Sequence, residues 1–343
     1  MAWLNGWQYR KKITISGSSG AGTNYQVLLK VGESSGAIGA NFHINGHSAN
    51  FPTDIRFTAD DGTTLLSFWV EQVTGTSPNR TAYVWVKVAA DLGTNKNIYI
   101  YYGNSSASNV SNGDNTFLLF DDFEGTSLDT SKWSILDQDL DCSYSVSNSR
   151  LRVQQGPGPY GTWQHMVVGS LSTFGSGRVF GGRIIALYES ASIGIDKHFF
   201  IGFSSNDNLN SASYGRNMVD HFWYAFYDPN RMYLRTRSAE ADTLIQTTLQ
   251  TVPYIVEVGR LSSEVKIFYN HTYETNLTTN IPTGTYPFLI YATGGATSGT
   301  IYADIDWIFI RKFVSPEPAF SFADAEETAP VPSSSRRLFL MSM

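Results

Sequence analysis

Apolar and polar residues alternate along most of the chain, and the periodicity of an amphipathic helix is almost absent. In "AYVWVKVA", for example, Val84, Val86 and Val88 fall on one side of an extended strand. Residues two apart share a face of a strand, so this alternation predicts half-buried strands. Similar stretches recur at intervals of about 8–20 residues with turn residues between them, which predicts an all-β protein of antiparallel sandwiches.

The strand patterns form two blocks. The first covers residues 1–104 and includes a predicted hairpin that turns at Asp61 and Gly62. Residues 105–116 are small and polar and predict a linker, and a longer series of strands occupies residues 117–323. Residues 324–343 are acidic, then rich in Pro and Ser, and predict a flexible tail. The alternative for this tail is an arm that adds a strand to a neighbouring subunit.

Composition narrows the classes of protein that fit. The 343 residues are 42% hydrophobic, which is enough apolar material for two cores, and only 16% are charged. A net charge of −6 without a long basic run disfavours a nucleic-acid partner. Cys142 is the single cysteine, so no intrachain disulfide forms.

The chain carries no recognisable membrane or export segment. No apolar run approaches the roughly 18 residues that a transmembrane helix needs. The first fifteen residues, "MAWLNGWQYRKKITI", lack the apolar stretch of a secretory signal. We therefore expect no membrane insertion, and arrival at any outer surface by another route.

Three stretches of the first block carry a family resemblance: "WQYRKKITI", "DIRFTADDGTTLLSFWVE" and "IYIYYGN". They resemble a family of domains of unknown function in archaeal, bacterial and viral surface proteins. In that family such a block is often followed by a concanavalin A-like, or laminin G-like, jelly roll. "FDDFEG" with "DTSKW" looks like the opening of that second domain, and "DIDWIFIRKFVSPEP" looks like its close. The resemblance implies glycan binding, adhesion or architecture, and in some branches sugar hydrolysis.

The carboxylates near this opening raise the question of a metal. In jelly rolls of this type the first and last strands lie side by side, which brings Glu124 towards Asp306. Crowded carboxylates repel one another unless they are protonated or bridged by a cation, and Ca²⁺ accepts several such oxygens. Some carbohydrate-binding sandwiches hold a structural calcium in a similar place. The resemblance implies Asp122, Glu124 and Asp306 as its ligands.

Two other interpretations of these carboxylates remain open. In "YADIDWIF" Asp304 and Asp306 share one face and Ile305 and Trp307 the other, and acidic residues at strand ends are mostly solvated. Catalysis by a glycosidase needs two carboxyls about 5–5.5 or 6.5–9.5 Å apart. The compact Glu-x-Asp-x-x-Glu strand of jelly-roll glucanases does not occur. We therefore predict that the opening stretch closes the fold, with or without a metal, and carries no catalysis.

The best candidate for ligand binding is the aromatic hairpin "HFWYAFYDPNRMYLRTR". By alternation Trp223 and Tyr227 share one face, and Tyr233 and Arg235 form a matching row on the return strand. Exposed rings of this kind stack on sugars while arginine binds hydroxyls or carboxylates. Ordinary cross-strand packing explains the same pattern, and a protein partner is a further alternative.

Together these features predict a non-enzymatic, surface-displayed structural or adhesive protein. Its expected ligand is a glycan or cell-surface polysaccharide, and its expected partners are other virion or surface-layer subunits within a homo-oligomer. The absence of a signal and the apolar ending "RRLFLMSM" favour a virion component of a phage or archaeal virus: a decoration, fibre or receptor-binding protein. A cell-surface adhesin or carbohydrate-binding protein is one alternative, and a glycoside hydrolase or polysaccharide lyase is another.

Overall fold

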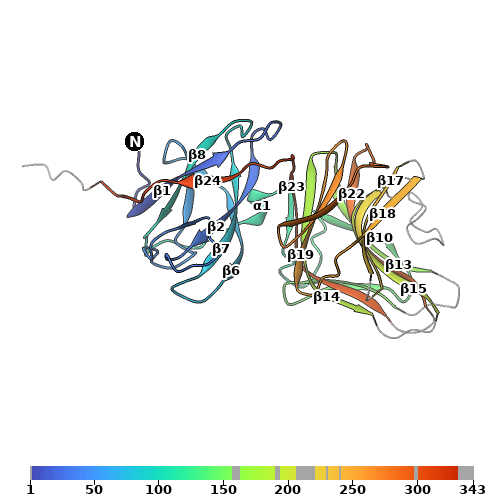
Figure 1. Cartoon of the computed structure of the whole chain (residues 1–343). Helices are drawn as coiled ribbons and strands as arrows, with labels where there is room; N and C mark the ends of the chain where they lie inside the picture. Colours follow the sequence, from blue (N-terminus) through green and yellow to red (C-terminus); the bar gives the residue numbers. More distant parts are fainter. Residues whose placement is uncertain are drawn as a thin grey trace, which may run out of the picture. The chain divides into compact units, whose positions relative to one another are not determined.

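The computed structural model describes residues 2–156, 163–189, 194–205, 221–228, 231–238, 241–296 and 300–330. Within these ranges, the side chains of residues 189, 194–197, 221–228, 231, 242 and 295–296 are outside the description. The chain divides into two compact units (Figure 1). Unit 1 comprises Met1–Thr116 with Glu317–Met343, and unit 2 comprises Phe117–Pro316. None of the described helices is long and apolar enough to span a membrane.

Unit 1 contains two sheets. The first has the order β24-β1-β8-β4-β5, with β25 also beside β1. These strands are β24 (Ala319–Ala323), β1 (Tyr9–Ser16), β8 (Lys96–Tyr102), β4 (Arg56–Ala59), β5 (Leu65–Leu66) and β25 (Glu327–Thr328). The second sheet runs β3 (Phe42–His43), β2 (Tyr25–Gly32), β7 (Thr81–Val88) and β6 (Phe68–Thr74). A single helical turn, α1 (Gly113–Thr116), ends the unit's first segment.

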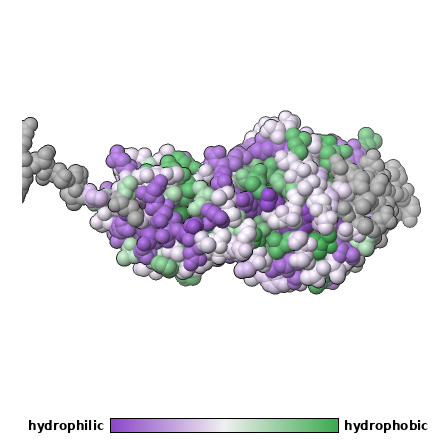
Figure 2. Space-filling model, turned by 90° about the horizontal axis from the view of Figure 1, so that it is seen from above, coloured by the Kyte–Doolittle hydropathy of each residue, from purple (hydrophilic) through white to green (hydrophobic). Residues whose placement is uncertain are grey.

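Burial and turn formation in unit 1 follow the alternation and the turn residues of the sequence. Val84, Val86 and Val88 are buried, as their alternation predicts, and hydrophilic residues cover much of the unit's visible face in Figure 2. The predicted hairpin joins β4 to β5. Gly62 supplies the positive φ of +81° at its turn, and the Asp61 carboxylate accepts backbone hydrogen bonds from the two residues that follow the glycine.

Unit 2 contains two larger sheets whose described strand pairs are all antiparallel. The seven-stranded sheet runs β10 (Trp133–Gln138), β13 (Gln164–Phe174), β22 (Tyr286–Ala296), β15 (Gly194–Ser204), β16 (His221–Asp228), β17 (Arg231–Ser238) and β18 (Ala241–Thr247). The eight-stranded sheet runs β11 (Ser143–Val146), β12 (Leu151–Gln155), β23 (Ile301–Lys312), β14 (Arg178–Glu189), β19 (Tyr254–Arg260), β20 (Val265–Tyr269) and β21 (Thr272–Leu277), with β9 (Leu119–Asp121) also beside β23.

One hydrophobic core joins the two sheets of unit 2. Val168 and Ile290 of the seven-stranded sheet belong to the same buried cluster as Val153 and Ile305 of the eight-stranded sheet. Two facing sheets with apolar inner faces form a sandwich. The predicted all-β fold class of antiparallel sheets is therefore confirmed, with unit 2 as an antiparallel sandwich; in unit 1 the short β3 pairs with β2 in parallel.

The C-terminal residues differ from their predicted assignment. The sequence pattern places residues up to 323 in the second domain and assigns 324–343 to a flexible tail. Instead β24 pairs with β1 from Ile13 to Ser16, and β25 pairs with Tyr9 and Arg10, so both strands belong to unit 1. A tail is therefore the wrong interpretation for residues 324–328. The physical reason is that backbone pairing with an edge strand needs no apolar alternation in the strand that is added.

Candidate functional site

The first of the opening carboxylates of unit 2, Asp121, stabilises the fold. Strand β9 lies beside the last strand β23, with Asp121 opposite Ile308, which confirms the predicted neighbourhood of first and last strands. The buried Asp121 carboxylate accepts hydrogen bonds from the Trp133 indole at 2.7 Å and from the Phe123 amide at 2.8 Å. Phe123 has a positive φ of 50°, so this hydrogen bond fixes a turn that a non-glycine residue rarely adopts. Burial raises the pKa of Asp121.

The predicted calcium ligands do not form a donor cluster. The Asp306 carboxylate pairs with the Arg183 guanidinium at 2.8 Å, and Glu124 accepts a hydrogen bond from the Ser149 hydroxyl at 2.9 Å. Asp122 is half-buried. Across the part of the chain that the structure describes, no three His, Cys, Asp or Glu side chains are grouped to hold a metal ion. The residues present therefore do not fit a calcium site, because a guanidinium already neutralises one of the three carboxylates.

The last strand of unit 2, β23, contains a bulge that changes which of its side chains share a face. The ladder between β23 and β14 shifts its register here, and Asp306 has no partner residue in it. Ile305 belongs to the core of the sandwich, whereas Trp307 stacks on Phe309 with ring centroids 5.4 Å apart. Both sequence neighbours of Phe309 belong to the core. The predicted shared face of Ile305 and Trp307 is therefore wrong, because an extra residue reverses the alternation.

The aromatic hairpin forms as β16 and β17, but its return strand is not an exposed row. Arg235 lies opposite Trp223 in the ladder and is only 2% exposed. Tyr233 is half-buried and packs against a cluster of Val167, Phe200, Leu289 and Tyr291. The side chains of Trp223 and Tyr227 lie outside the described residues. The hairpin as a glycan site stays a prediction, and its two described members are a half-buried tyrosine and a buried arginine.

A different surface of unit 2 gathers polar groups and open aromatic rings. Strands β11, β12, β23 and β14 lie next to one another, and their register aligns side chains across the sheet. One row contains Ser145, Arg152 and Asp304, and the next contains Gln154, Tyr302 and Tyr188. We call this surface the polar–aromatic face, defined by Ser145, Arg150, Arg152, Tyr188, Tyr302 and Asp304.

The centre of the polar–aromatic face is held by a paired arginine. The Arg152 guanidinium donates to both Asp304 oxygens, at 2.6 and 2.7 Å, which is the strong bidentate geometry. It also lies 3.9 Å from the centroid of the Tyr302 ring, within the range of a cation–π contact. Tyr302 stacks on Tyr188 with centroids 5.0 Å apart, and Tyr188 is 46% exposed. The arrangement fixes one arginine while it leaves an aromatic ring open to solvent.

A polar pocket of about 290 Å³ lies beside this arginine. Its lining consists of Ser145, Ser147, Asn148, Arg150, Arg152 and Asp304. The Arg150 side chain is exposed and makes no hydrogen bond or ion pair with another described residue. The lining supplies hydroxyl, amide and guanidinium groups, and its one carboxylate is bound to Arg152. These groups suit polar recognition better than acid–base hydrolysis, which needs two carboxyl groups.

The family model of a domain of unknown function (DUF2341) matches residues 52–136. This match supports the predicted N-terminal domain of unknown function. No curated protein matches the sequence.

Solved structures resemble the chain at low identity. The Bacillus licheniformis β-glucanase is 13% identical with a TM-score of 0.42, and the match covers 57% of this chain and 97% of that one. A β-1,3-1,4-glucanase (lichenase) from a mouse hindgut metagenome is 13% identical with a TM-score of 0.43, covering 57% and 99%. LamAcat from Zobellia galactanivorans is 14% identical with a TM-score of 0.41, covering 59% and 100%. Likeness at this level says nothing about the activity of the present chain.

Sequence reasoning missed the pocket although a local signal was present. In "SRLRVQ" Arg150, Arg152 and Gln154 alternate with Leu151 and Val153, which predicts a strand with one polar face. The pocket itself depends on β11 and β23 lying on either side of β12. That neighbourhood joins residues about 150 positions apart, and no local pattern encodes it.

Proposed function

We propose that the protein is a surface-displayed structural or adhesive protein whose second unit binds glycans at the polar–aromatic face. The observation that supports this proposal is the open ring of Tyr188, which the stacked Tyr302 ring and Arg152 connect to a pocket lined by hydroxyl, amide and guanidinium groups. A sugar offers an apolar C–H face and a rim of hydroxyls. The aromatic rings of the polar–aromatic face suit the C–H face of a sugar, and its polar side chains suit the hydroxyls.

The fixed parts of the site favour binding. Asp304 and Tyr302 hold the Arg152 guanidinium on two sides, so little side-chain entropy is lost when a ligand hydrogen-bonds to it. Arg150, whose side chain has no hydrogen-bond or ion-pair partner among the described residues, supplies a second guanidinium at the pocket. A few oriented polar groups beside an aromatic surface are typical of small-ligand sites.

The charge of the pocket favours an acidic sugar. Two arginines and one aspartate leave the lining with an excess of one positive charge, in a chain whose net charge is −6. Guanidinium groups bind carboxylates in bidentate geometry more strongly than they bind neutral hydroxyls. We therefore expect carboxylate-bearing glycans to bind more tightly than their neutral counterparts.

The biological setting that goes with this function is a virion surface, with a bacterial or archaeal cell surface as the alternative. Homo-oligomeric display would raise weak monovalent glycan binding through avidity. Co-purification of the full chain with virus particles tests the virion setting. Its recovery from cell envelopes in the absence of particles would contradict that setting and favour an adhesin.

A glycan array tests the function directly. The full chain is expected to bind a subset of glycans, and Tyr188→Ala should weaken that binding about tenfold, a loss of about 1.4 kcal/mol. Tyr273→Ala is the matched control, since Tyr273 is an exposed tyrosine on β21 of the same sheet and lies outside the polar–aromatic face.

Other outcomes of the array assign the function elsewhere. Binding that is lost in Trp223→Ala but unchanged in Tyr188→Ala would move the site to the aromatic hairpin. A chain that binds no glycan would contradict the proposed function. Release of sugars from a polysaccharide panel would instead support the glycoside hydrolase or lyase alternative.

A further inference from the structure

The open side of β1 is occupied by a segment from the other end of the chain. We call residues 317–329 the C-terminal segment. Its backbone follows β1, with the Asp324 amide donating to the Lys12 carbonyl at 2.9 Å and the Ala329 amide donating to the Gln8 carbonyl at 2.8 Å. The edge of β1 together with the side chains that contact this segment forms the β1 groove. Strand addition of this kind is a recurrent mode of peptide recognition.

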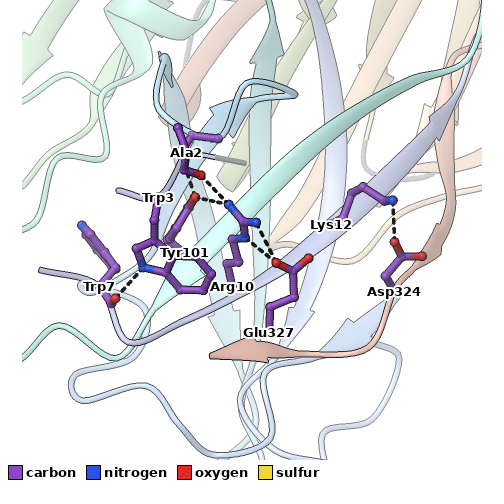
Figure 3. A network of polar contacts seen from close by, with 9 residues as sticks. Ala2, Trp3, Trp7, Arg10, Lys12, Tyr101, Asp324 and Glu327 are labelled. Atoms are coloured by element: carbon purple, nitrogen blue, oxygen red, sulfur yellow. Dashed lines mark hydrogen bonds and ion pairs between the residues drawn. The ribbon is translucent and has the colours of Figure 1, made fainter. Parts of the chain in front are cut away.

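Within the β1 groove, the buried side chain of Arg10 binds the carboxylate of Glu327. The Arg10 guanidinium is 4.4 Å from the ring centroids of both Trp3 and Tyr99. It donates to Glu327 at 2.9 and 2.6 Å, and to the Tyr101 hydroxyl at 2.8 Å (Figure 3). Arg10 is 3% exposed, so the groove contains a buried cation whose carboxylate partner, among the described residues, comes from the C-terminal segment.

A second acidic residue of the segment has its own set of donors. Glu326 accepts a hydrogen bond from the Tyr102 hydroxyl at 2.6 Å and contacts the His47 ring nitrogen at 2.8 Å. The Asn45 amide is 3.3 Å from the same carboxylate. Three side chains from two parts of unit 1, the loop that contains Asn45 and His47 and the strand β8, therefore surround one carboxylate.

The remaining contacts extend this recognition along the segment. Lys12 pairs with Asp324 at 2.8 Å, as Figure 3 shows. Phe320 stacks on Phe42 with ring centroids 5.6 Å apart. Tyr25 donates to the Glu317 carboxylate at 2.8 Å. The β1 groove therefore contacts acidic side chains, an aromatic ring and the backbone of the segment at defined positions. A bare edge strand would supply the backbone hydrogen bonds alone.

We propose that the β1 groove is a strand-acceptor site that takes the C-terminal segment of a second copy of this chain as well as its own, and so joins copies by strand exchange. The contacts described above all lie within unit 1, so an identical segment from another copy would make the same set. Unit 2, Phe117–Pro316, separates the groove from the segment along the chain. Whether a segment binds its own groove or that of another copy then depends on the protein concentration and on how far the segment can extend from its own unit 1. The exchange requires no new contact.

Two full-chain variants test this exchange in a mixture. The donor variant, Glu326→Ala with Glu327→Ala, keeps an intact groove but has a weakened segment. The acceptor variant, Arg10→Gln with Tyr102→Phe, keeps an intact segment but has a weakened groove. Mixing them should produce a heterodimer in native mass spectrometry, because only the combination offers an intact groove to an intact segment. Each variant alone should give at least tenfold less dimer.

A milder acceptor variant guards against misfolding. Lys12→Glu with Tyr102→Phe retains the buried Arg10, and near-ultraviolet circular dichroism checks that each variant is folded. A mixture of folded variants that contains only monomers would overturn the proposal.

A synthetic peptide of residues 317–330 identifies the link between the copies. In excess, it should dissociate the heterodimer and bind the donor variant at least tenfold more tightly than the same peptide with its Glu327 replaced by Gln. A heterodimer that persists in excess peptide would overturn the proposal, since another surface would then join the copies. Peptide binding to the donor variant without any heterodimer in the mixture would likewise exclude the second copy as occupant.

Discussion

Arg10 in unit 1 and Arg152 in unit 2 contact the same types of group, but Arg10 is buried and Arg152 is half-exposed. Each guanidinium lies over a tyrosine ring and pairs with a carboxylate. The Arg10 side chain is 4% exposed, and two further rings and two further oxygen acceptors complete its surroundings. The Arg152 side chain is 41% exposed and borders an open pocket.

Under the proposed function, this difference separates a structural contact at Arg10 from a ligand-binding contact at Arg152. A buried cation whose donors are satisfied stabilises the segment that supplies its carboxylate, and losing one partner leaves an uncompensated charge. A half-exposed cation contributes little to stability, because water replaces a lost partner. The part of such a guanidinium that faces solvent remains available to a ligand. Burial of the pair, more than its chemistry, should therefore decide whether a substitution changes stability or binding.

The largest effect is expected at Glu257, a buried acid that two basic side chains surround. His271 at 2.7 Å and Arg311 at 3.0 Å surround its carboxylate. Burial by itself would raise the pKa of Glu257, but these two cations lower it to about 2. A folded-state pKa below the unfolded value means that this group stabilises the protein above about pH 4.5. That contribution should be lost as the pH falls from about 4.5 towards 2.

Unfolding by urea at a series of pH values measures this loss. Glu257→Gln should be less stable than the wild type by about 3 kcal/mol at pH 7, since it leaves a buried guanidinium without its ion partner. The difference between the two proteins should shrink below pH 4. A constant difference down to pH 2 would show that the carboxylate charge is not the cause.

The next effect is expected at Glu327, whose partner is buried although Glu327 itself is partly exposed. Glu327→Ala should lower the free energy of unfolding by about 2 kcal/mol, the typical value of hydrogen bonds to a charged group. Asp324→Ala is the matched control, since its pair with Lys12 is exposed on both sides and should contribute less than about 1 kcal/mol. Equal losses in the two variants would contradict a stabilising role of burial at Arg10.

A smaller effect, and on a different quantity, is expected at Asp304. Asp304→Asn removes the charge that orients Arg152 and should weaken glycan binding several-fold. Its free energy of unfolding should change by less than about 1 kcal/mol, because Arg152 is half-exposed. Isothermal titration and urea unfolding on the same preparation separate the two quantities. A large loss of stability with unchanged affinity would place Arg152 with Arg10 as a structural contact.

The smallest effect is expected on removing divalent cations. Because Asp306 is paired with Arg183, a chelator should leave the melting temperature of the chain unchanged. Differential scanning fluorimetry with and without added Ca²⁺ measures this. A melting temperature that rises with Ca²⁺ would restore the sequence-based calcium hypothesis.

The sequence pattern predicts the sandwiches better than it predicts their sites. Alternation at Val84, Val86 and Val88 depends on local chemistry that any strand with one buried face shares. The pairing of Arg10 with Glu327 joins the two ends of the chain, and the acidic, Pro-rich composition around Glu327 looks like a tail. Arg150 and Arg152 alternate as in a strand, but their pocket depends on the distant Asp304. Long-range neighbours of this kind are fixed by topology.

Amide hydrogen exchange of the full chain with and without a glycan identified on the array tests the central claim most directly. Glycan binding at the polar–aromatic face predicts slower exchange in residues 143–155, 178–189 and 301–306, which include the strands that carry this face, and no change in residues 221–238. Slower exchange confined to residues 221–238 would contradict the account and place the ligand on the aromatic hairpin.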